Sequence, residues 1–338
     1  MSKVLVTGGA GYLGSHMCVQ LLDQSIDVVV VDNLSNSSVK SLETVKQLCQ
    51  KDLKFYDADL RDRAAIQSVF AENDISAVIH FAGLKAVGES VEHPHRYYDN
   101  NVNGTLQLIE CMDQAQVKTL IFSSSATVYG PTETMPITEE HPLNPISPYG
   151  RTKLMIEDML RDIHAADPNW RISLLRYFNP VGAHPSGQLG EDPNGIPNNL
   201  VPNISQVAIG KRPELKVFGD DYPTPDGTCI RDYIHVTDLV DGHLCALRFL
   251  EDHGGCVTHN LGTGNGYSVY EVIEAFEAAA KRPIPHILAG RRVGDAAECY
   301  ADPSKAQADL GWRATKGLER MCEDVWRWQT AHPDGFDV

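Results

Sequence analysis

The sequence predicts an α/β protein: a doubly wound parallel sheet of the Rossmann type with a smaller mixed α/β lobe at the C-terminal side. Short apolar runs such as residues 27–32 alternate with helically spaced stretches such as residues 63–72 through the first half of the chain. Uniformly apolar strands separated by helices are typical of a parallel sheet covered on both faces. Frequent Pro and Gly between residues 180 and 202 predict long ordered loops that build the second lobe, with a disordered linker as the alternative.

The individual elements follow from these patterns in chain order. We expect strands at residues 4–6, 27–32, 54–59, 77–81, 119–122 and 172–176, and helices at 15–23, 63–72, 98–114 and 153–165. Beyond the loops, residues 238–250 have helical spacing and residues 258–261 resemble a strand. The expected domains are 1–180 and 181–338, with a soft boundary because segments between 236 and 262 can pack back on the first domain.

Charge and cysteine usage limit the function classes. The 338-residue chain carries a formal net charge of -16, which argues against non-specific binding to nucleic acid or anionic membranes. The eight cysteines are scattered without a CxxC pair, so we expect reduced thiols, no metal site and a cytoplasmic location. The sequence shows neither a signal-peptide pattern nor an apolar run of transmembrane length, so we expect no signal peptide and no membrane-spanning helix.

A glycine-rich loop at residues 7–14 follows the first expected strand and opens the first expected helix. Gly8, Gly11 and Gly14 allow backbone N–H groups to approach a pyrophosphate at a helix N-terminus, whereas the alternative is a plain tight turn. Asp32 ends the second strand, 18 residues after Gly14. A carboxylate there accepts hydrogen bonds from a ribose diol and repels a 2′-phosphate, which favours NAD over NADP; a solvated strand-end Asp is the alternative.

Three further positions lie where later strands or helices meet the predicted cofactor. Asp59 and Leu60 follow the third strand and are expected to flank the adenine, although Asp59 can equally be a helix cap. Lys85 follows the fourth strand and either reaches cofactor oxygens or is solvated. Asn100 belongs to an Asn-rich run in an expected helix, where Asn is unfavourable, so we expect it near the nicotinamide.

Ser125, Tyr149 and Lys153 form the candidate catalytic group. Tyr149 and Lys153 are four residues apart and share one face of a helix. The ammonium and a cationic nicotinamide would lower the pKa of Tyr149, which makes it a candidate base for an alcohol whose carbon loses hydride. Ser125 can hydrogen-bond the reacting hydroxyl. A serine hydrolase is not favoured because the chain lacks a G-x-S-x-G elbow.

Across nearly its whole length the chain resembles the extended short-chain dehydrogenase/reductases, and among them the UDP-glucose 4-epimerase family. Residues 7–14, 80–90, 149–153, 175–183 and 231–236 carry the resemblance. It implies an NAD-binding Rossmann domain at 1–180, a UDP-sugar-binding lobe at 181–338 and tightly bound NAD. It also implies reversible C4 epimerisation of UDP-galactose to UDP-glucose through a 4-keto intermediate, a step of galactose metabolism, by a homodimer whose candidate interface is helices 98–114 and 153–165.

The same resemblance implies the binding residues. Ser125, Tyr149 and Lys153 would contact the cofactor, and further cofactor-binding residues would be Tyr12, Leu13, Asn33, Asn36, Phe81, Ala82, Gly83, Tyr177 and Phe178. Besides Ser125 and Tyr149, the substrate would contact Asn179, Asn199, Leu200, Lys216, Val217, Phe218, Arg231, Tyr233, Arg292, Asp295 and Cys299. Phe218 would line the uracil site, Asp295 would bind the uridine ribose, and Arg231 and Arg292 would bind the diphosphate. Guanidinium forks suit a diphosphate, with surface ion pairing as the alternative.

Two rival functions and one specificity question remain open. Dehydratases that resemble this chain carry an Asp-Glu pair directly after the residue matching Ser125, where this chain has Ala126 and Thr127. A decarboxylase is a further rival, and a non-catalytic NAD-sensing regulator would not need Tyr149 and Lys153 together. Cys299 stands where some epimerases carry a bulky tyrosine, so either the pocket also admits N-acetylated UDP-sugars or Cys299 only packs.

Overall fold

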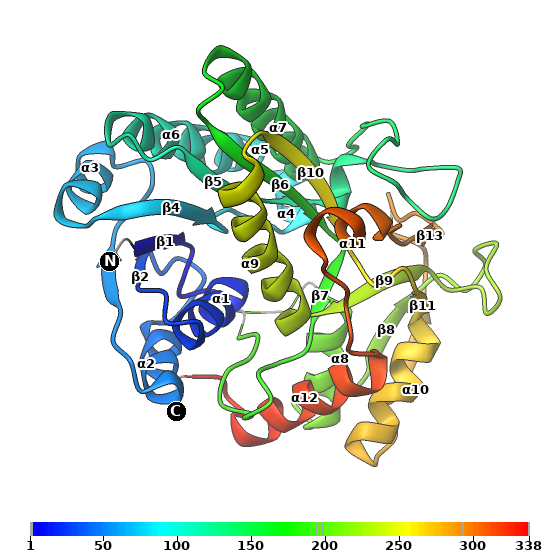
Figure 1. The fold of residues 1–338 in the computed structure, drawn as a ribbon. Coiled ribbons are helices and arrows are strands. Elements are labelled where there is room, and N and C mark those ends of the chain that lie inside the picture. The colour runs from blue at the N-terminus through cyan, green and yellow to red at the C-terminus, as the bar shows by residue number, and fades with distance from the viewer. Residues whose placement is uncertain (1–2, 193–194, 196, 198, 293, 337–338) are drawn as a thin grey trace.

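A seven-stranded parallel sheet forms the centre of the computed structural model, which describes residues 3–192, 195, 197, 199–292 and 294–336 (Figure 1). Its order is β10-β6-β5-β4-β1-β2-β3, and every neighbouring pair is parallel. The strands are β1 (Lys3–Thr7), β2 (Val28–Asp32), β3 (Lys54–Asp57), β4 (Ile75–His80), β5 (Thr119–Ser125), β6 (Arg171–Tyr177) and β10 (Cys256–Leu261). The predicted doubly wound fold is confirmed.

Helices cover both faces of this sheet because successive strand residues are apolar on both sides. Val4 and Val6 of β1 join one hydrophobic cluster, whereas Leu5 between them joins the other. The first cluster includes residues of α1 (Tyr12–Asp23), α2 (Val39–Cys49) and α9 (Val236–His253). The second includes residues of α3 (Arg63–Glu72), α6 (Gly104–Gln114) and α7 (Pro148–Ala166).

Several predicted helices begin elsewhere than expected: α1 starts at Tyr12 rather than residue 15 and α9 at Val236 rather than residue 238, and two others differ more. The segment expected at 98–114 is a π-helix over Tyr98–Asn103 followed by α6, and it is preceded by α4 (Val87–Glu92) and α5 (Pro94–Tyr97). The helix expected at 153–165 begins earlier, at Pro148, because the Ser147 side chain accepts a hydrogen bond from Gly150 N at 3.1 Å. Ser as N-cap followed by Pro is a strong helix start, and it places Tyr149 in the first turn.

The second half of the chain adds a smaller mixed region. Its sheet pairs the central strand β9 (Ile230–His235) with β7 (Asn179–Val181), β11 (Gly266–Ser268) and β13 (Glu298–Cys299), while β8 (Leu215–Phe218) pairs with β12 (His286–Ala289). A separate hydrophobic cluster joins α8 (Leu200–Ala208), α10 (Val269–Ala280) and α12 (Leu318–Ala331), which lie together in Figure 1. The short helix α11 (Ser304–Leu310) contacts α9 and β10.

Part of the second half belongs to the large sheet. Strand β10 pairs with β6 from Cys256 to Leu261, and α9 packs against α1. The division at residues 180 and 181 itself stays a prediction. Among the described residues, no helix is both long and apolar enough to cross a membrane.

Candidate active site

The glycine loop between β1 and α1 has the geometry of a phosphate cradle. A Cβ at Gly8, where φ is +68°, would lie 2.8 Å from Ala82 N, and one at Gly14 would lie 2.1 Å from Gly8 O. Both positions therefore require glycine. Helix α1 begins at Tyr12 behind Gly11, without a side-chain cap and without an acidic residue in its first turn. Its N–H groups are thus suited to an anionic ligand such as a pyrophosphate.

Asp32, at the end of β2, is tied to this loop. Its carboxylate accepts hydrogen bonds from Ala10 N at 3.0 Å, Leu34 N at 2.9 Å and Ser37 Oγ at 2.9 Å. Asp32 is therefore not a freely solvated strand end. The fixed negative charge beside the loop is the arrangement expected for a ribose diol and is unfavourable for a 2′-phosphate.

Asp59 is held by neighbours on both sides. Its carboxylate accepts hydrogen bonds from Asn33 Nδ2 at 2.9 Å, from Arg61 Nε at 2.9 Å and from Arg61 Nη2 at 2.8 Å. Hydrogen bonding to Arg61 holds the pKa of Asp59 well below its usual range. The alternative reading of Asp59 as a helix cap is wrong, because Asp62 caps α3 by accepting from Ala65 N.

The segment after β4 connects the glycine loop to the catalytic group. Phe81 N donates to Thr7 O at 3.1 Å. A Cβ at Gly83 would lie 3.3 Å from Asn101 Oδ1 and 3.8 Å from Lys153 Nζ. Strands β1 and β4 are neighbours at the point where the strand order reverses, which is where doubly wound sheets bind nucleotides.

Tyr149 and Ser125 are both buried, each with 7% of its surface exposed. Burial raises the pKa of the Tyr149 phenol above its ordinary value, and a hydrogen bond with Ser125 lowers it. Ser125 Oγ accepts hydrogen bonds from Thr127 N at 3.2 Å and Thr127 Oγ1 at 3.0 Å. The serine hydroxyl is thereby fixed at the end of β5, within reach of the tyrosine.

Lys153 is buried one turn further along α7. Its Nζ donates to Ser123 O at 2.8 Å and lies 4.8 Å from the centre of the Phe122 ring. Burial lowers the pKa of Lys153 to about 8. The sequence predicted that Lys153 and a cationic cofactor ring together lower the pKa of Tyr149. In the chain itself the ammonium is bound by the backbone of β5, and the effect of burial on the phenol dominates.

Two arginines of the second region converge on Asp295. Arg292 Nε lies 2.9 Å from Asp295 Oδ2, and Arg231 Nη2 lies 3.7 Å from Asp295 Oδ1. The Arg292 guanidinium also stacks over Phe218, 4.9 Å from the ring centre. Surface ion pairing was the alternative to diphosphate binding for Arg231 and Arg292, and these ion pairs are present. They also gather the predicted diphosphate, ribose and uracil contacts at one place.

Cys299 lies where this region meets the catalytic group. On β13 it is in register with Arg231 of β9. Its side chain packs against a buried hydrophobic cluster that includes Phe178. Ala126 and Leu154, which directly follow Ser125 and Lys153 in sequence, pack against the same cluster. Burial raises the pKa of Cys299 to about 11, so the thiol is neutral near pH 7 and behaves as a small apolar side chain.

Comparison with known proteins agrees with this geometry. The sequence profile of the NAD dependent epimerase/dehydratase family matches residues 4–262. The chain belongs to this family. A UDP-glucose 4-epimerase of Bacillus subtilis is 60% identical over 333 residues, covering 98% of each chain, and that of Mus musculus is 54% identical, covering 99% of each. The structure of UDP-glucose 4-epimerase from Bifidobacterium longum in complex with NAD+ and UDP has a TM-score of 0.95, at 55% identity over 99% of this chain and 100% of that one.

The remaining predicted residues lie on several elements of both regions. Tyr12 OH donates to Gly182 O at 2.7 Å, and Asn179 of β7 is in register with Tyr233 of β9. The others lie in α1 (Leu13), after β2 (Asn36), after β3 (Leu60), at the end of β6 (Tyr177), at the start of α8 (Leu200) and on β8 (Lys216 and Val217). None of these positions by itself tests the binding role predicted for it.

Sequence reasoning missed Asn101. Its side chain accepts from Leu84 N at 2.8 Å and donates to Leu84 O at 3.0 Å and Thr152 Oγ1 at 3.1 Å. It therefore holds the segment after β4 against α7. The Asn run at residues 100–103 is the sequence signal for this site, although the prediction assigns the contact to Asn100. The contact predicted for Asn100 stays a prediction, although π-helical turns such as this one often occur at functional sites.

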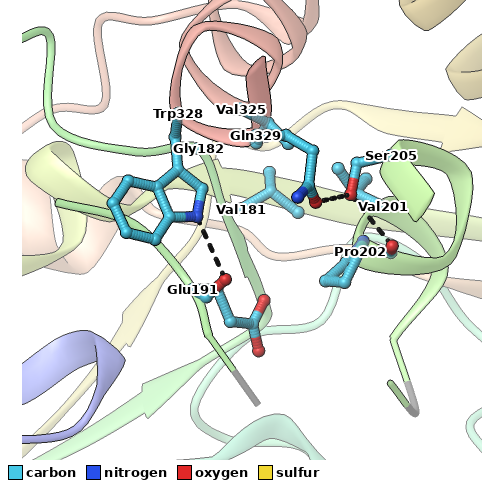
Figure 2. A pocket seen from close by; sticks show the side chains of 9 residues that line it. All are labelled: Val181, Gly182, Glu191, Val201, Pro202, Ser205, Val325, Trp328 and Gln329. Atoms are coloured by element: carbon cyan, nitrogen blue, oxygen red, sulfur yellow. Dashed lines mark hydrogen bonds between the residues drawn. The ribbon is translucent and has the colours of Figure 1, made fainter. Parts of the chain in front are cut away.

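Glu191 is a second missed residue. Its carboxylate lies 3.0 Å from Lys85 Nζ and 3.4 Å from Asn199 Nδ2, so it joins a predicted cofactor residue to a predicted substrate residue. Figure 2 shows the indole of Trp328 directed at the backbone oxygen of Glu191, with which it forms a 3.3 Å hydrogen bond beside a small cavity. A lone Glu in a Pro- and Gly-rich loop offered no sequence signal for this role.

Proposed function

We propose that this chain interconverts UDP-galactose and UDP-glucose by inverting C4 of the hexose, with NAD bound at the crevice between β1 and β4. One observation carries the proposal. Lys153 of the buried group of Ser125, Tyr149 and Lys153 lies beside Gly83 of the crevice segment, and the residues that follow Ser125 and Lys153 pack against the same hydrophobic wall as Cys299. A sugar alcohol between crevice and wall would meet a base and a hydride acceptor together. The UDP-glucose 4-epimerases that cover almost the whole chain at 54–60% identity support the same reaction.

The nucleotide would be held by the glycine loop, the uncapped start of α1 and the carboxylate of Asp32. When bound, NAD accepts the hydride that leaves C4 and returns it, so that no external oxidant is consumed. A solved structure of UDP-glucose-4-epimerase from Stenotrophomonas maltophila with bound NAD has a TM-score of 0.96 at 49% identity.

Tyr149 would take the proton of the 4-hydroxyl and later return it, and Ser125 would hydrogen-bond the same oxygen. The proton and the hydride both leave the C4 alcohol, which gives a 4-keto sugar, and both return to it with C4 inverted. Because burial by itself raises the pKa of Tyr149, the base function requires positive charge near the phenol, of which the Lys153 ammonium is one source. Arg231 and Arg292 would retain the diphosphate while the keto sugar turns over.

The decisive experiment uses UDP-galactose deuterated at C4. Purified wild-type protein should form UDP-glucose that retains deuterium at C4, because the hydride that leaves is the one that returns. Loss of the label to solvent would contradict this path. A 4-keto-6-deoxy product would indicate a dehydratase, release of CO2 from a UDP-sugar acid would indicate a decarboxylase, and NAD binding without turnover would indicate a regulator.

We further propose a homodimer formed through α6 and α7, in the cytoplasm. Leu106 of α6 and Met155 of α7 are 39% and 47% exposed, and with Met159 and Ile163 they line one shallow groove. A second copy would cover this apolar face. Met155→Asp should convert a dimer to a monomer in sedimentation velocity, and a wild-type monomer would refute the assembly. All eight cysteines are free thiols, which suits a reducing compartment, and cell fractionation tests the location.

A further inference from the structure

Glu157 is a fully buried acid on the same face of α7 as the catalytic pair. Residues 149, 153 and 157 follow one another at four-residue intervals, and all three side chains are buried. The Glu157 side chain has no exposed surface. A buried carboxylate is costly unless it is paired and hydrogen-bonded, so its partners indicate what it is for.

The carboxylate of Glu157 has three partners: Arg161, Arg176 and Ser124 of strand β5. Arg176 donates from Nε to Oε1 at 2.9 Å and from Nη2 to Oε2 at 2.6 Å, and Arg161 Nη2 donates to Oε2 at 2.6 Å. Ser124 Oγ donates to Oε1 at 2.5 Å. Two guanidinium groups already satisfy the carboxylate charge. The bond from Ser124 is therefore more than ion-pair stabilisation needs.

Ser124 stands between two residues of the site. The backbone oxygen of Ser123 accepts the hydrogen bond from Lys153 Nζ, and Ser125 supplies the hydroxyl beside Tyr149. A carboxylate that anchors Ser124 consequently determines where both neighbours lie. Small displacements of positioned groups are costly in catalysis.

We propose that Glu157 is a positioning residue for the reaction: its buried carboxylate anchors the end of β5 through Ser124 and helps to keep Lys153 cationic. This inference rests on the proposed function, because it assigns Glu157 to the same site. Glu157 touches neither sugar nor nucleotide in this assignment and acts through Lys153 and Ser124.

The charges around Lys153 agree with this role. Burial lowers the pKa of Lys153, and the Glu157 carboxylate opposes that effect. The titratable or charged groups around Lys153 and Glu157 include Tyr149 and Arg161 of α7, His80 of β4, Arg176 and Tyr177 of β6, and His243 of α9. Burial lowers the pKa of His80 to about 3 and that of His243 to about 4, and raises those of both tyrosines. Glu157 is thus the negative charge in this set near neutral pH.

Several charged groups on the remaining neighbours of α7 form ion pairs. In α4 and α5, Glu89 pairs with Arg96, and Asp99 of the π-helical turn pairs with Arg61. Their side chains are partly exposed, so water screens them. Removal of the Glu157 charge should therefore lower the pKa of Lys153, because none of these groups supplies an equivalent negative charge.

Glu157→Gln tests the charge, because glutamine retains the size and an acceptor for Ser124. In this variant we expect kcat to fall about 10- to 100-fold with KM and bound NAD little changed, because a small misplacement of a positioned group can cost about 10²-fold. The alkaline limb of the kcat profile should move about one unit toward lower pH. The ¹³Cε resonance of Lys153, assigned with Lys153→Met, should titrate at correspondingly lower pH, a readout that does not depend on turnover.

Two further variants separate the charge from the hydrogen bond. Ser124→Ala should lower kcat without moving the alkaline limb. Asp158→Asn is the matched control: this carboxylate also pairs with Arg161 at 2.9 Å but is 62% exposed, so kcat and the Lys153 titration should stay at wild-type values. If the alkaline limb of the kcat profile moved as far in Asp158→Asn as in Glu157→Gln, the shift would be a general charge effect and the assignment would be overturned.

Arg161→Gln keeps the proposal testable if Glu157→Gln does not fold. Arg161 is partly exposed, and its loss leaves the Arg176 pair in place while removing one positive charge near the carboxylate. The alkaline limb and the Lys153 titration should then move toward higher pH. An unchanged Lys153 titration in folded Glu157→Gln, or in folded Arg161→Gln when the former cannot be made, refutes the proposal. Absence of epimerisation by the wild-type chain would instead refute the proposed function.

Discussion

The two halves of the site are built in opposite ways. On β5 and α7, Ser125, Tyr149 and Lys153 are each at most 7% exposed, and their partners are hydroxyls and backbone groups. At the rim of the second region, the Arg292 side chain is 53% exposed and is held by the ion pair with Asp295. One half is fixed by the core, whereas the other is held by charges that water can reach.

This difference separates chemistry from binding. Burial sets the protonation of Tyr149 and Lys153, so the fold itself controls the proton transfer. Exposed ion pairs contribute only about 0–1 kcal/mol, so Arg292, whose side chain is 53% exposed, can exchange Asp295 for a phosphate at little cost. Changes in the buried half should therefore act on kcat, and changes at the rim should act on KM.

The largest effect should come from Tyr149→Phe. The variant retains the ring and loses the proton acceptor, so kcat should fall about 10²- to 10⁴-fold while NAD and UDP binding stay nearly unchanged. The conversion of UDP-galactose to UDP-glucose measures the loss. Tyr56→Phe, which removes an exposed hydroxyl bonded to Glu72, is the control and should retain full activity. Wild-type turnover in Tyr149→Phe would show that Tyr149 is not the base and that the buried half of the site does not carry the chemistry.

Arg292→Ala probes the other half. A lost charge-assisted contact of about 1.5–3 kcal/mol should raise KM for the UDP-sugar roughly 10- to 100-fold with kcat within a factor of about three. The neighbouring Arg291 also stacks on an aromatic ring, that of Tyr222, and pairs with Asp221, but is not among the predicted diphosphate contacts. Arg291→Ala should leave KM within about twofold. Equal effects of the two substitutions would show that the rim is only a charged surface.

The pH dependence sharpens the contrast. Lys153 has a pKa of about 8 in the folded chain against an ordinary value of 10.5. Above about pH 8 the ammonium is lost, so kcat should fall by up to about tenfold per pH unit. The effect of Lys153 on the free energy of unfolding changes with pH in the opposite direction. The unfolded chain binds the proton more tightly, so this contribution rises with pH between about 8 and 10.5. Activity and thermal unfolding measured over pH 7–10 should diverge, and a kcat that stays flat to pH 10 would contradict the assignment.

The sequence predicted what depends on local pattern. The glycine loop, the strand-end Asp32 and the helix Arg63–Glu72 lie where they were expected, because turn chemistry and periodicity are properties of neighbouring residues. The missed features depend on residues far apart in the chain. Glu157 meets Ser124 across 33 positions and Glu191 meets Lys85 across 106, and neither spacing has a sequence signature. The early start of α7 does have a local sequence signal, the N-cap Ser147 before Pro148.

The smallest change on the principal reaction is expected at Cys299, where the two halves meet. Its neutral thiol packs against the same hydrophobic cluster as Ala126 and Leu154, the residues after Ser125 and Lys153, so a tyrosine there would take up space beside the catalytic group. If the space beside Cys299 admits a 2-acetamido group, the wild-type chain should also interconvert UDP-N-acetylglucosamine and UDP-N-acetylgalactosamine.

Cys299→Tyr should then reduce turnover of the acetylated pair at least about fivefold relative to the plain hexoses, because overfilling a packed wall typically costs about 1–3 kcal/mol. Turnover of UDP-galactose should change less than about twofold. The ratio of the two activities is the measurement, since it cancels any loss of folded protein. Cys299→Ser, which retains the small size, is the matched control and should leave the ratio unchanged. A wild-type chain inactive on the acetylated pair, or a ratio that Cys299→Tyr does not alter, would mean that Cys299 only packs and that other residues of the wall set the pocket size.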